Sequence, residues 1–511
     1  MSDTQVHQEA ETELLVVTKE SAFSTWLQSG AALAVITVVG AILRLIGLND
    51  QSYWLDEGAS LDYVQVHNSA WSIISSLAHG GDNHPPLHFL TLFFMNQLFD
   101  VTNEAAMRFP SVVASVTLIP AAWMLATVVA PRWRWLAASL VAVSPFLIWY
   151  AQEARMYAMA EAFAAWSIVG FFTYLRTGER RWLQLHAVCR VLGFYTHVYA
   201  VLLSAAELAL LPSVEKDKRR QILRTMAIEF ALMLPWFVVL YGVRGNTAGT
   251  ETGSPIVAAA YSFFVFVFGY SFGPGVRDLH ISHHLSSGVL MQLAGAGLVA
   301  VGLGYATWLC RSNKWLRQLA LVVAVPMALA LLVTVTTSVS LNARYISIMY
   351  MPFVCILAMS IGKQWSKNAV KAASIGLTAI IGVSLVNYWT DSTYEKDDYR
   401  SAMHYVHSTG SKDPLFVMTY PQPAELYGDI HDSIINLAPD ANGAKNWQNL
   451  RQSGIRANRV WILQARSWET DDDNSHLRSL LQKGTIVDDQ HFAGVRLVHL
   501  NVTTPNDPVK P

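Results

Sequence analysis

The sequence predicts an α-helical polytopic membrane protein with a small C-terminal soluble α/β domain. Its 511 residues are 52% hydrophobic and only 14% charged, which is too apolar for an ordinary soluble enzyme of this length. Long apolar runs recur up to residue 390, and shorter strand-like segments follow. We therefore expect an N-terminal tail (1–29), a transmembrane domain (30–390) and a soluble domain (391–511).

The apolar runs predict about eleven transmembrane helices, because each is long enough to cross, or nearly cross, a hydrocarbon core of roughly 30 Å. They lie at residues 30–48, 109–130, 136–150, 158–175, 182–195, 198–212, 225–242, 286–308, 318–336, 345–361 and 371–389. Arg44 and Arg190 fall within two of these runs, and we expect both to be structural ion-pair partners.

Clusters of basic residues occur in every second loop between these runs. They lie at residues 132–134, 176–181, 216–224, 311–317 and 363–371, whereas each alternate loop has only isolated arginines. Basic loops remain in the cytoplasm. We therefore expect a multi-pass protein of the cytoplasmic (inner) membrane, with a cytoplasmic N-terminus and an extracytoplasmic C-terminal domain.

Two further apolar stretches, 87–99 and 256–272, would reverse this charge pattern if they crossed the membrane. We interpret the first as a helix lying on the outer surface within the first outer loop (49–108), and the second as a surface or re-entrant helix. Both are expected to be juxtamembrane helices.

The region from residue 391 has the alternation of a small sheet covered by helices. Strand-like segments lie at 415–419, 460–464 and 495–502, and a helical one lies at 475–484. No glycine-rich nucleotide-binding motif is present. The net charge of −1 gives no reason to expect nucleic acid as a partner.

The uncommon polar residues gather in the predicted outer loops, where all of them can face one cavity. The candidates are Asp56, Glu57, His84, Arg108, Glu153, Arg155, Tyr157, His197, Arg344 and Tyr345. Adjacent loop acids are often only solvated charges, and arginines at helix ends often only reach lipid headgroups. Alternatively, a carboxylate at the interface acts as a general base while two or three arginines bind a phosphate.

The histidines, including the HISHH cluster at 280–284, have no spacing typical of metal ligands, so we predict no metal site and no separate cofactor. Hydrogen bonding or headgroup contact is the preferred interpretation of these side chains.

Four motifs, in order and spacing, resemble a known family: WLDE (54–57), HPPL (84–87), MRFPS (107–111) and SPFLIWYAQEARMYAM (144–159). RYISIMYMP and YEKDDYRSAMHYV are weaker matches. The family is that of the polytopic GT-C glycosyltransferases, in the group of protein O-mannosyltransferases, aminoarabinose transferases of lipid A and their bacterial relatives. The resemblance covers roughly residues 30–390 and implies a GT-C type of transmembrane domain.

This resemblance implies an inverting, mannosyltransferase-like transfer of a sugar from a polyprenyl-phosphate carrier to an acceptor hydroxyl at the extracytoplasmic face. Asp56 would be the base, and Glu57 would orient it or the acceptor. His84 stands where aminoarabinose transferases have a lysine and protein mannosyltransferases a histidine. Arg108 would contact the donor phosphate or order the loop.

The expected partners are the polyprenyl-phosphate sugar, membrane lipids and a glycan, lipid or protein acceptor. One alternative is a transporter or flippase of a lipid-linked saccharide, which predicts broken helices near the bilayer centre and two related halves. Another is a non-catalytic, sugar-sensing relative, which loss of the Asp-Glu pair would favour.

Overall fold

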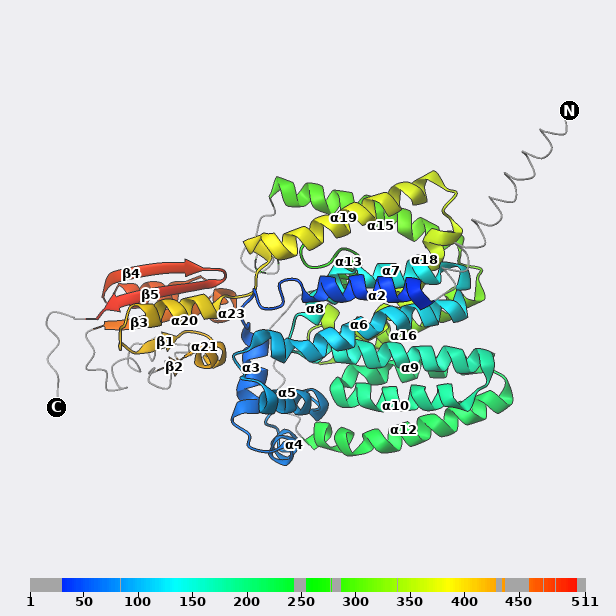
Figure 1. The fold of residues 1–511 in the computed structure, drawn as a ribbon, viewed down its shortest axis with the longest axis horizontal. Helices are drawn as coiled ribbons and strands as arrows, with labels where there is room; N and C mark the ends of the chain where they lie inside the picture. Colours follow the sequence, from blue (N-terminus) through cyan, green and yellow to red (C-terminus); the bar gives the residue numbers. More distant parts are fainter. Residues whose placement is uncertain are drawn as a thin grey trace, which may run out of the picture.

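The protein consists of a helical bundle and a small α/β domain attached to one end of it (Figure 1). The computed structural model describes residues 30–502, except 83, 243–253, 276, 278–285, 338, 429–433, 437–458, 472 and 483. The predicted tail (1–29) and the HISHH histidines lie outside the described residues.

Each of the eleven predicted apolar runs coincides with a helix or a broken helix of the bundle. These are α2 (Gly30–Leu45), α6 (Glu104–Val129), α7 (Arg134–Ala142) with α8 (Pro145–Ala151), α9 (Tyr157–Thr177), α10 (Arg180–Thr196), α11 (Leu202–Leu210), α12 (Lys216–Gly242), α15 (Ser287–Leu309), α16 (Lys314–Thr336), α17 (Ala343–Ile346) with α18 (Tyr350–Lys363), and α19 (Asn368–Thr390). Within the described chain, seven helices are long and apolar enough to cross a membrane, or eight if α7 and α8 form one bent span. The count of eleven crossings therefore stays a prediction.

The break between α7 and α8 follows from the Ser144-Pro145 pair. Proline has no backbone N–H and disfavours helical geometry in the preceding residue, so α8 begins anew at Pro145. The Ser144 hydroxyl then accepts a hydrogen bond from the Leu147 N–H at 3.2 Å and caps the new helix. The two helices differ in direction by 51°.

Three helices of the first predicted outer loop lie at the end of the bundle next to the α/β domain (Figure 1). They are α3 (Leu55–Gln65), α4 (Ala70–Ala78) and α5 (Pro86–Leu98). The stretch 87–99, predicted to be a surface helix, forms α5, whose Phe89 and Leu92 are buried in one cluster with Ile73 and Leu77 of α4. These helices form a platform beneath the α/β domain.

Helix α13 (Pro255–Phe268) corresponds to the second ambiguous stretch and packs against α8, α16, α17 and α19. Its 14 residues are too few for a full membrane crossing, which needs about 20. Of the two interpretations offered for this stretch, its position among the bundle helices fits the re-entrant one.

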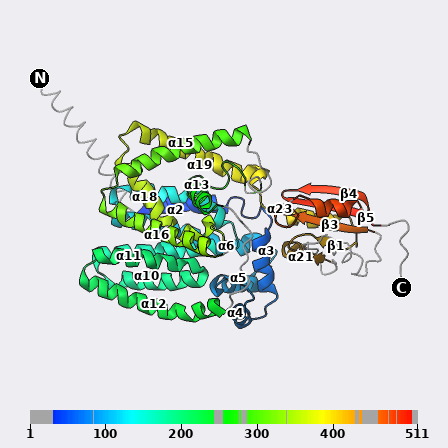
Figure 2. The same cartoon turned by 180° about the vertical axis from the view of Figure 1, so that it is seen from behind.

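The turns with the basic clusters lie at the end of the bundle opposite the α/β domain (Figures 1 and 2). They are the connections α6–α7, α9–α10, α11–α12, α15–α16 and α18–α19. All predicted cytoplasmic loops therefore share one end of the bundle, as a single membrane orientation requires.

The C-terminal domain is a five-stranded mixed sheet in the order β2-β1-β3-β5-β4. The strands are β1 (Leu415–Val417), β2 (Ile434–Asn436), β3 (Arg459–Ala465), β4 (Thr485–Phe492) and β5 (Val495–Asn501). β1 runs parallel to β2 and β3, and β5 pairs antiparallel with β3 and β4. The predicted small sheet is confirmed.

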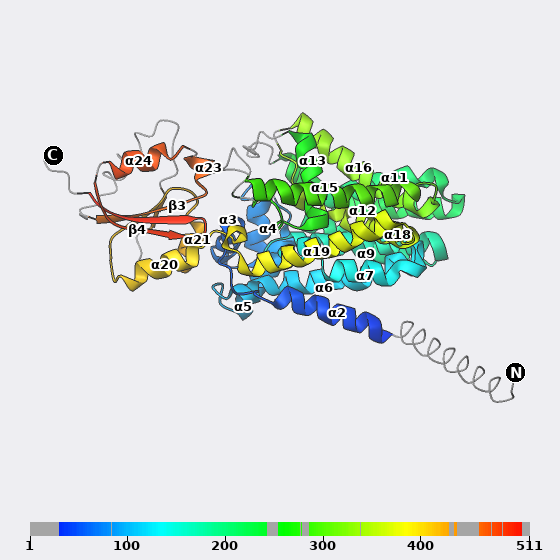
Figure 3. The same ribbon diagram turned by 90° about the horizontal axis from the view of Figure 1, so that it is seen from above.

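Helices cover both faces of this sheet (Figure 3). Helix α20 (Tyr399–Ser408) packs on one face through Met403 and Val406, and α24 (Ser475–Leu481) packs on the other through Leu477 and Leu480. The short helices α21 (Gln422–Tyr427) and α23 (Ser467–Thr470) point toward the bundle (Figure 1).

The contact between the domain and the bundle is close and polar. A Cβ atom on Gly58 of α3 would lie 2.6 Å from Cγ of Pro423, which is too close, so α3 and α21 approach through this glycine. Arg400 donates hydrogen bonds to Glu104 and to the Asn49 carbonyl. Tyr427 donates to Glu104 and accepts from the Tyr53 N–H. These contacts fix the domain over the platform helices.

Candidate active site at the domain junction

Asp56 and Glu57 occupy the first turn of α3, where the helix N-terminus favours negative charge. Successive helical residues point about 100° apart. The two side chains therefore enter different surroundings: Glu57 is fully buried, whereas the side chain of Asp56 is 21% exposed. This difference assigns them different roles.

Glu57 is an anchor within the protein. Its two carboxylate oxygens accept hydrogen bonds from Nε and Nη2 of Arg108, both at 2.9 Å, and one of them accepts the Ala154 N–H at 2.7 Å. Lys396 lies 3.5 Å away. Burial raises the pKa of Glu57, but these cations and the N–H outweigh it and bring the pKa down to about 2. Glu57 is thus a buried carboxylate with its charge fully compensated.

Arg108 is equally enclosed. Besides Glu57, it donates to the carbonyls of Leu48, Gln51 and Ser52, at 3.0, 2.8 and 3.1 Å. These bonds hold the segment between α2 and α3 in place. Of the two roles implied for Arg108, the geometry fits loop ordering, since its donors are already satisfied inside the protein.

Asp56 faces a partly open, cationic space. Its Oδ2 accepts a hydrogen bond from Nη1 of Arg344 at 2.7 Å, and its carbonyl accepts one from Arg155 at 3.0 Å. Burial raises the pKa of Asp56, but Arg344 and then Arg155 outweigh it and hold the pKa below its usual value. Asp56 is therefore an ionised and partly accessible carboxylate.

Aromatic rings surround the Arg344 guanidinium. Its Cζ lies 5.4 Å from the ring centroids of Tyr157 and Tyr345 and 5.9 Å from that of Trp54. The ring of His197 stacks on Tyr345 at 5.6 Å. These contacts hold the guanidinium beside Asp56 and enclose the site with apolar faces.

His84 lies at the edge of this group. Its Nδ1 is 2.6 Å from the Asp82 carboxylate, its side chain is 30% exposed, and it lies close enough to Asp56 and His197 to interact with both electrostatically. The structure thus brings Asp56, Arg155, Tyr157, His197, Arg344 and Tyr345 together, with His84 beside them. Glu57, Arg108 and Glu153 lie in the buried layer behind.

This arrangement could remove a proton from a hydroxyl group while cations beside it bind an anionic group. Asp56 is charged and accessible, and guanidinium groups adjoin it. Guanidinium groups bind phosphate oxygens well.

Comparison with known proteins points to the same kind of chemistry. Residues 83–271 match the family model described as dolichyl-phosphate-mannose-protein mannosyltransferase. The structure of ArnT from Cupriavidus metallidurans in the apo state superposes with a TM-score of 0.56 at 11% identity, over 95% of this chain and 100% of ArnT. The chain has the GT-C glycosyltransferase fold.

Two further GT-C structures contain lipid phosphates. ArnT from the same organism bound to undecaprenyl phosphate matches with a TM-score of 0.52 at 11% identity, over 94% of this chain and 100% of that one. The oligosaccharyltransferase AglB from Archaeoglobus fulgidus, in complex with an inhibitory peptide and a dolichol-phosphate, matches with 0.51 at 10% identity, over 92% and 74%. No curated protein sequence matches the chain.

These matches confirm the GT-C resemblance and fold that the motifs predicted. They support the glycosyltransferase interpretation and give no support to the transporter alternative.

Two residues of the candidate site were not identified from the sequence. Lys396 is buried between Glu57 and Glu153, 3.5 and 3.6 Å away, and donates to the Gln152 carbonyl at 3.1 Å. Arg466, from the C-terminal domain, lies with its Cζ 5.8 Å from the Trp54 ring. The motif YEKDDYR contains Lys396 and was the available signal, whereas nothing in the sequence marked Arg466.

Glu153 is part of the buried layer behind the candidate site. It accepts a hydrogen bond from Trp149 Nε1 at 2.9 Å, and burial raises its pKa. Among the described residues, no group of three or more His, Cys, Asp or Glu side chains has a geometry that could hold a metal ion.

Proposed function

We propose that this protein transfers a sugar from a polyprenyl-phosphate donor to an acceptor hydroxyl at the extracytoplasmic face of the cytoplasmic membrane. The observation behind the proposal is the ionised, partly exposed Asp56, held by Arg344 at the end of a GT-C helical bundle. Mannose, the sugar named in the matching family description, is the first donor sugar to test.

Asp56 acts as the general base. It takes the proton of the acceptor hydroxyl, whose oxygen forms a bond to the anomeric carbon as the bond from that carbon to the phosphate oxygen breaks. One such displacement inverts the anomeric configuration. Arg344 and Arg155 stabilise the charge that develops on the leaving lipid phosphate. We propose that these guanidinium groups provide the positive charge without a bound metal.

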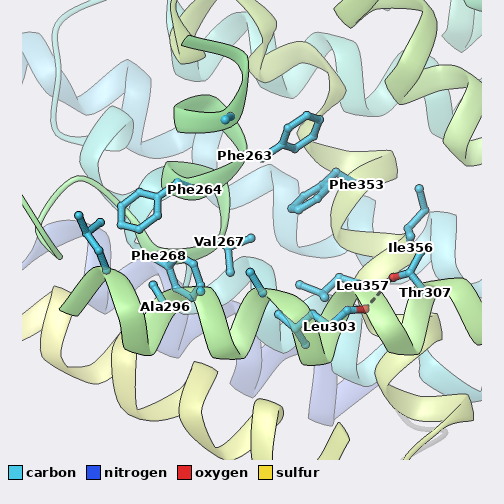
Figure 4. Close-up of a pocket in the computed structure, with 15 residues that line it drawn as sticks. Phe263, Phe264, Val267, Phe268, Ala296, Leu303, Thr307, Phe353, Ile356 and Leu357 are labelled. Carbon is cyan, nitrogen blue, oxygen red and sulfur yellow. Dashed lines mark hydrogen bonds between the residues drawn. The ribbon is translucent and has the colours of Figure 1, made fainter. Parts of the chain in front are cut away.

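The isoprenoid chain of the donor has an apolar groove available in the bundle (Figure 4). This groove of about 480 Å³ is lined by α13, α15 and α18, with Phe264, Leu303 and Phe353 among its side chains. Tyr270 lies two residues beyond the end of α13, and its hydroxyl forms a hydrogen bond of 2.8 Å with the hydroxyl of Tyr150. The ring of Tyr150 contacts that of Tyr157 in the site. A lipid tail in the groove would thus have its phosphate end near Arg344.

The orientation rests on charge. The basic turns favour the cytoplasmic side for their end of the bundle, and α3, which contains Asp56, lies with the C-terminal domain at the other end. A sugar used at the outer face would arrive attached to a lipid phosphate. Because that phosphate is anionic, a cationic site at this end of the bundle suits it.

The decisive experiment is transfer by purified Asp56→Asn, assayed with radiolabelled polyprenyl-phosphate mannose and a cell-envelope extract. Loss of the base should lower the rate by about 10²–10⁴-fold while donor binding persists. The matched control is Asp62→Asn, on the same helix, which should transfer as fast as wild type. Undiminished transfer by Asp56→Asn would exclude Asp56 as the base.

A further inference from the structure

A second cavity lies at the junction of the two parts of the molecule, on the side of the C-terminal domain. It has a volume of about 220 Å³. Its walls are the end of β3, the start of α23, the β4–β5 hairpin and Arg277 from the bundle. Figures 1 and 3 show α23 facing the bundle near α3, the helix that contains Asp56.

The lining combines hydrogen-bond donors with aromatic rings. Arg277, Arg466 and Arg496 provide guanidinium groups, and Trp468 and Phe492 provide rings. The buried Nε of Arg277 has no hydrogen-bond partner within the described chain, although this group can donate. Planar donors beside aromatic faces suit a sugar ring, which presents hydroxyl groups at its edge and C–H groups on its faces.

The charge balance favours a neutral ligand over a polyanion. Asp397 lies 3.6 Å from both Arg277 and Arg466, and Glu469 accepts a hydrogen bond from Arg466 at 2.8 Å. Asp489 pairs with Arg496 at 2.7 Å, so each of the three arginines already has a carboxylate partner. Their remaining N–H groups can still donate to hydroxyl oxygens.

Arg466 connects this cavity to the candidate base. Its backbone has φ 48° and ψ 50°, a left-handed conformation that is uncommon for a residue other than glycine and is often found at ligand-binding positions. Its Cζ lies 5.0 Å from the ring centroid of Trp468 and 5.8 Å from that of Trp54. Trp54 in turn lies beside Arg344, the partner of Asp56.

We propose that this cavity binds a neutral monosaccharide unit of a glycan acceptor and so places the acceptor hydroxyl next to Asp56. The inference rests on the proposed function and specifies its acceptor class. The groove proposed for the donor lipid lies within the bundle, whereas this cavity is lined mainly by residues of the C-terminal domain. A sugar bound there therefore belongs to the acceptor.

The first test measures transfer at varied donor and envelope-extract concentrations for Trp468→Ala, with Trp365→Ala at the opposite end as the matched control. Loss of one aromatic contact should raise the half-saturating extract concentration about tenfold and leave the KM for the donor unchanged. Trp365→Ala should match wild type, and Trp468→Phe should restore most of the affinity. A rise in donor KM alone, or no change, would overturn the proposal.

Arg496→Gln is a second variant, because Arg496 and its partner Asp489 are both partly exposed and their loss should leave the fold intact. It should also raise the half-saturating extract concentration. If Trp468→Ala does not fold, this variant decides, and an unchanged value contradicts the proposal.

The second test measures binding directly, by saturation-transfer NMR of the full-length protein with methyl glycosides of mannose, glucose, galactose and arabinose. At least one should receive saturation from wild type and from Asp56→Asn, and the signal should fall in Trp468→Ala. No signal with any glycoside, or an equal signal in Trp468→Ala, would refute the sugar site. Since Asp56→Asn tests the base separately, the two proposals can fail independently.

Discussion

The molecule contains two buried clusters of acidic and basic side chains, one at the domain junction and one inside the bundle. One is the site cluster around Asp56, at the domain junction. The other is the intrabundle cluster, formed by His186 and Arg190 of α10, Glu207 of α11 and Glu229 of α12. These three helices lie side by side in Figure 2. Both contain acids and cations, yet only one has the properties of a reaction site.

The intrabundle cluster is closed. Arg190 pairs with Glu207, and His186 Nε2 lies 3.1 Å from Glu229, with all four side chains at most 3% exposed. Arg190 is thus the structural ion-pair partner that the sequence predicted. Arg44 is buried too, but it donates to Ser115 and to backbone carbonyls such as that of Ala142. Ion pairs and hydrogen bonds of this kind link neighbouring helices within a membrane.

The site cluster is open at one point. Glu57 is enclosed like the intrabundle acids, whereas Asp56, one residue earlier, is 21% exposed and its partner Arg344 is 22% exposed. The comparison shows that partial access and neighbouring cations, rather than burial of charge alone, distinguish a reactive carboxylate from a structural one.

Of the variants that test this difference between the two clusters, Arg344→Ala should have the largest effect on the rate of sugar transfer. Removing the guanidinium should lower transfer by about 10²–10³-fold, since it stabilises the leaving phosphate. It should also allow the pKa of Asp56 to rise. A base is active when deprotonated, so the acidic limb of the kcat/KM profile should shift to higher pH. An unshifted profile would show that Arg344 does not control Asp56.

Glu57→Gln should mainly reduce stability. Arg108 would remain buried without its carboxylate partner, and Lys396 would keep only Glu153, which together costs about 3–5 kcal/mol. Thermal unfolding in detergent should therefore occur at a clearly lower temperature than in Asp56→Asn. Equal melting temperatures for the two variants would contradict the assignment of Glu57 as the anchor.

Glu207→Gln tests the intrabundle cluster. The loss of charge opposite Arg190 should weaken this interhelical contact and destabilise the bundle by about 1–2 kcal/mol. The KM values for donor and acceptor should equal those of wild type, measured on protein that remains folded. A raised donor KM would place this cluster in the substrate path and remove the contrast.

The smallest effect is expected from metal removal. Guanidinium groups provide the positive charge in the proposed mechanism, so EDTA should leave the initial rate unchanged. Loss of transfer on chelation, with recovery on adding Mg²⁺ or Mn²⁺, would show that a metal is required.

The sequence predicted most of the helices and three strands, because long apolar runs and short β-branched segments have strong local signals. It did not predict β4 (Thr485–Phe492), an edge strand with exposed positions and the acids Asp488 and Asp489. Edge strands bury little surface, so their hydrophobic alternation is weak.

The site was only partly predictable, for a physical reason. Loop position placed Asp56 and Arg344 together, but the enclosure of Arg108 by three carbonyls depends on chain segments that meet only in the folded protein. Lys396, near acidic residues at the start of the soluble domain, has the sequence pattern of a solvated side chain. Its burial between two carboxylates could not be inferred from that pattern.

The neighbouring positions of Asp56 and Glu57 also limit how the chain can vary in length. With Glu57 fixed to Arg108, one residue inserted between the two acids would turn the aspartate by about 100° around the helix, away from Arg344. An insertion in the turn between α3 and α4, which contains no candidate site residue, would leave this helical phase unchanged. Homologous chains should therefore differ in length in that turn and keep the spacing of the acids constant.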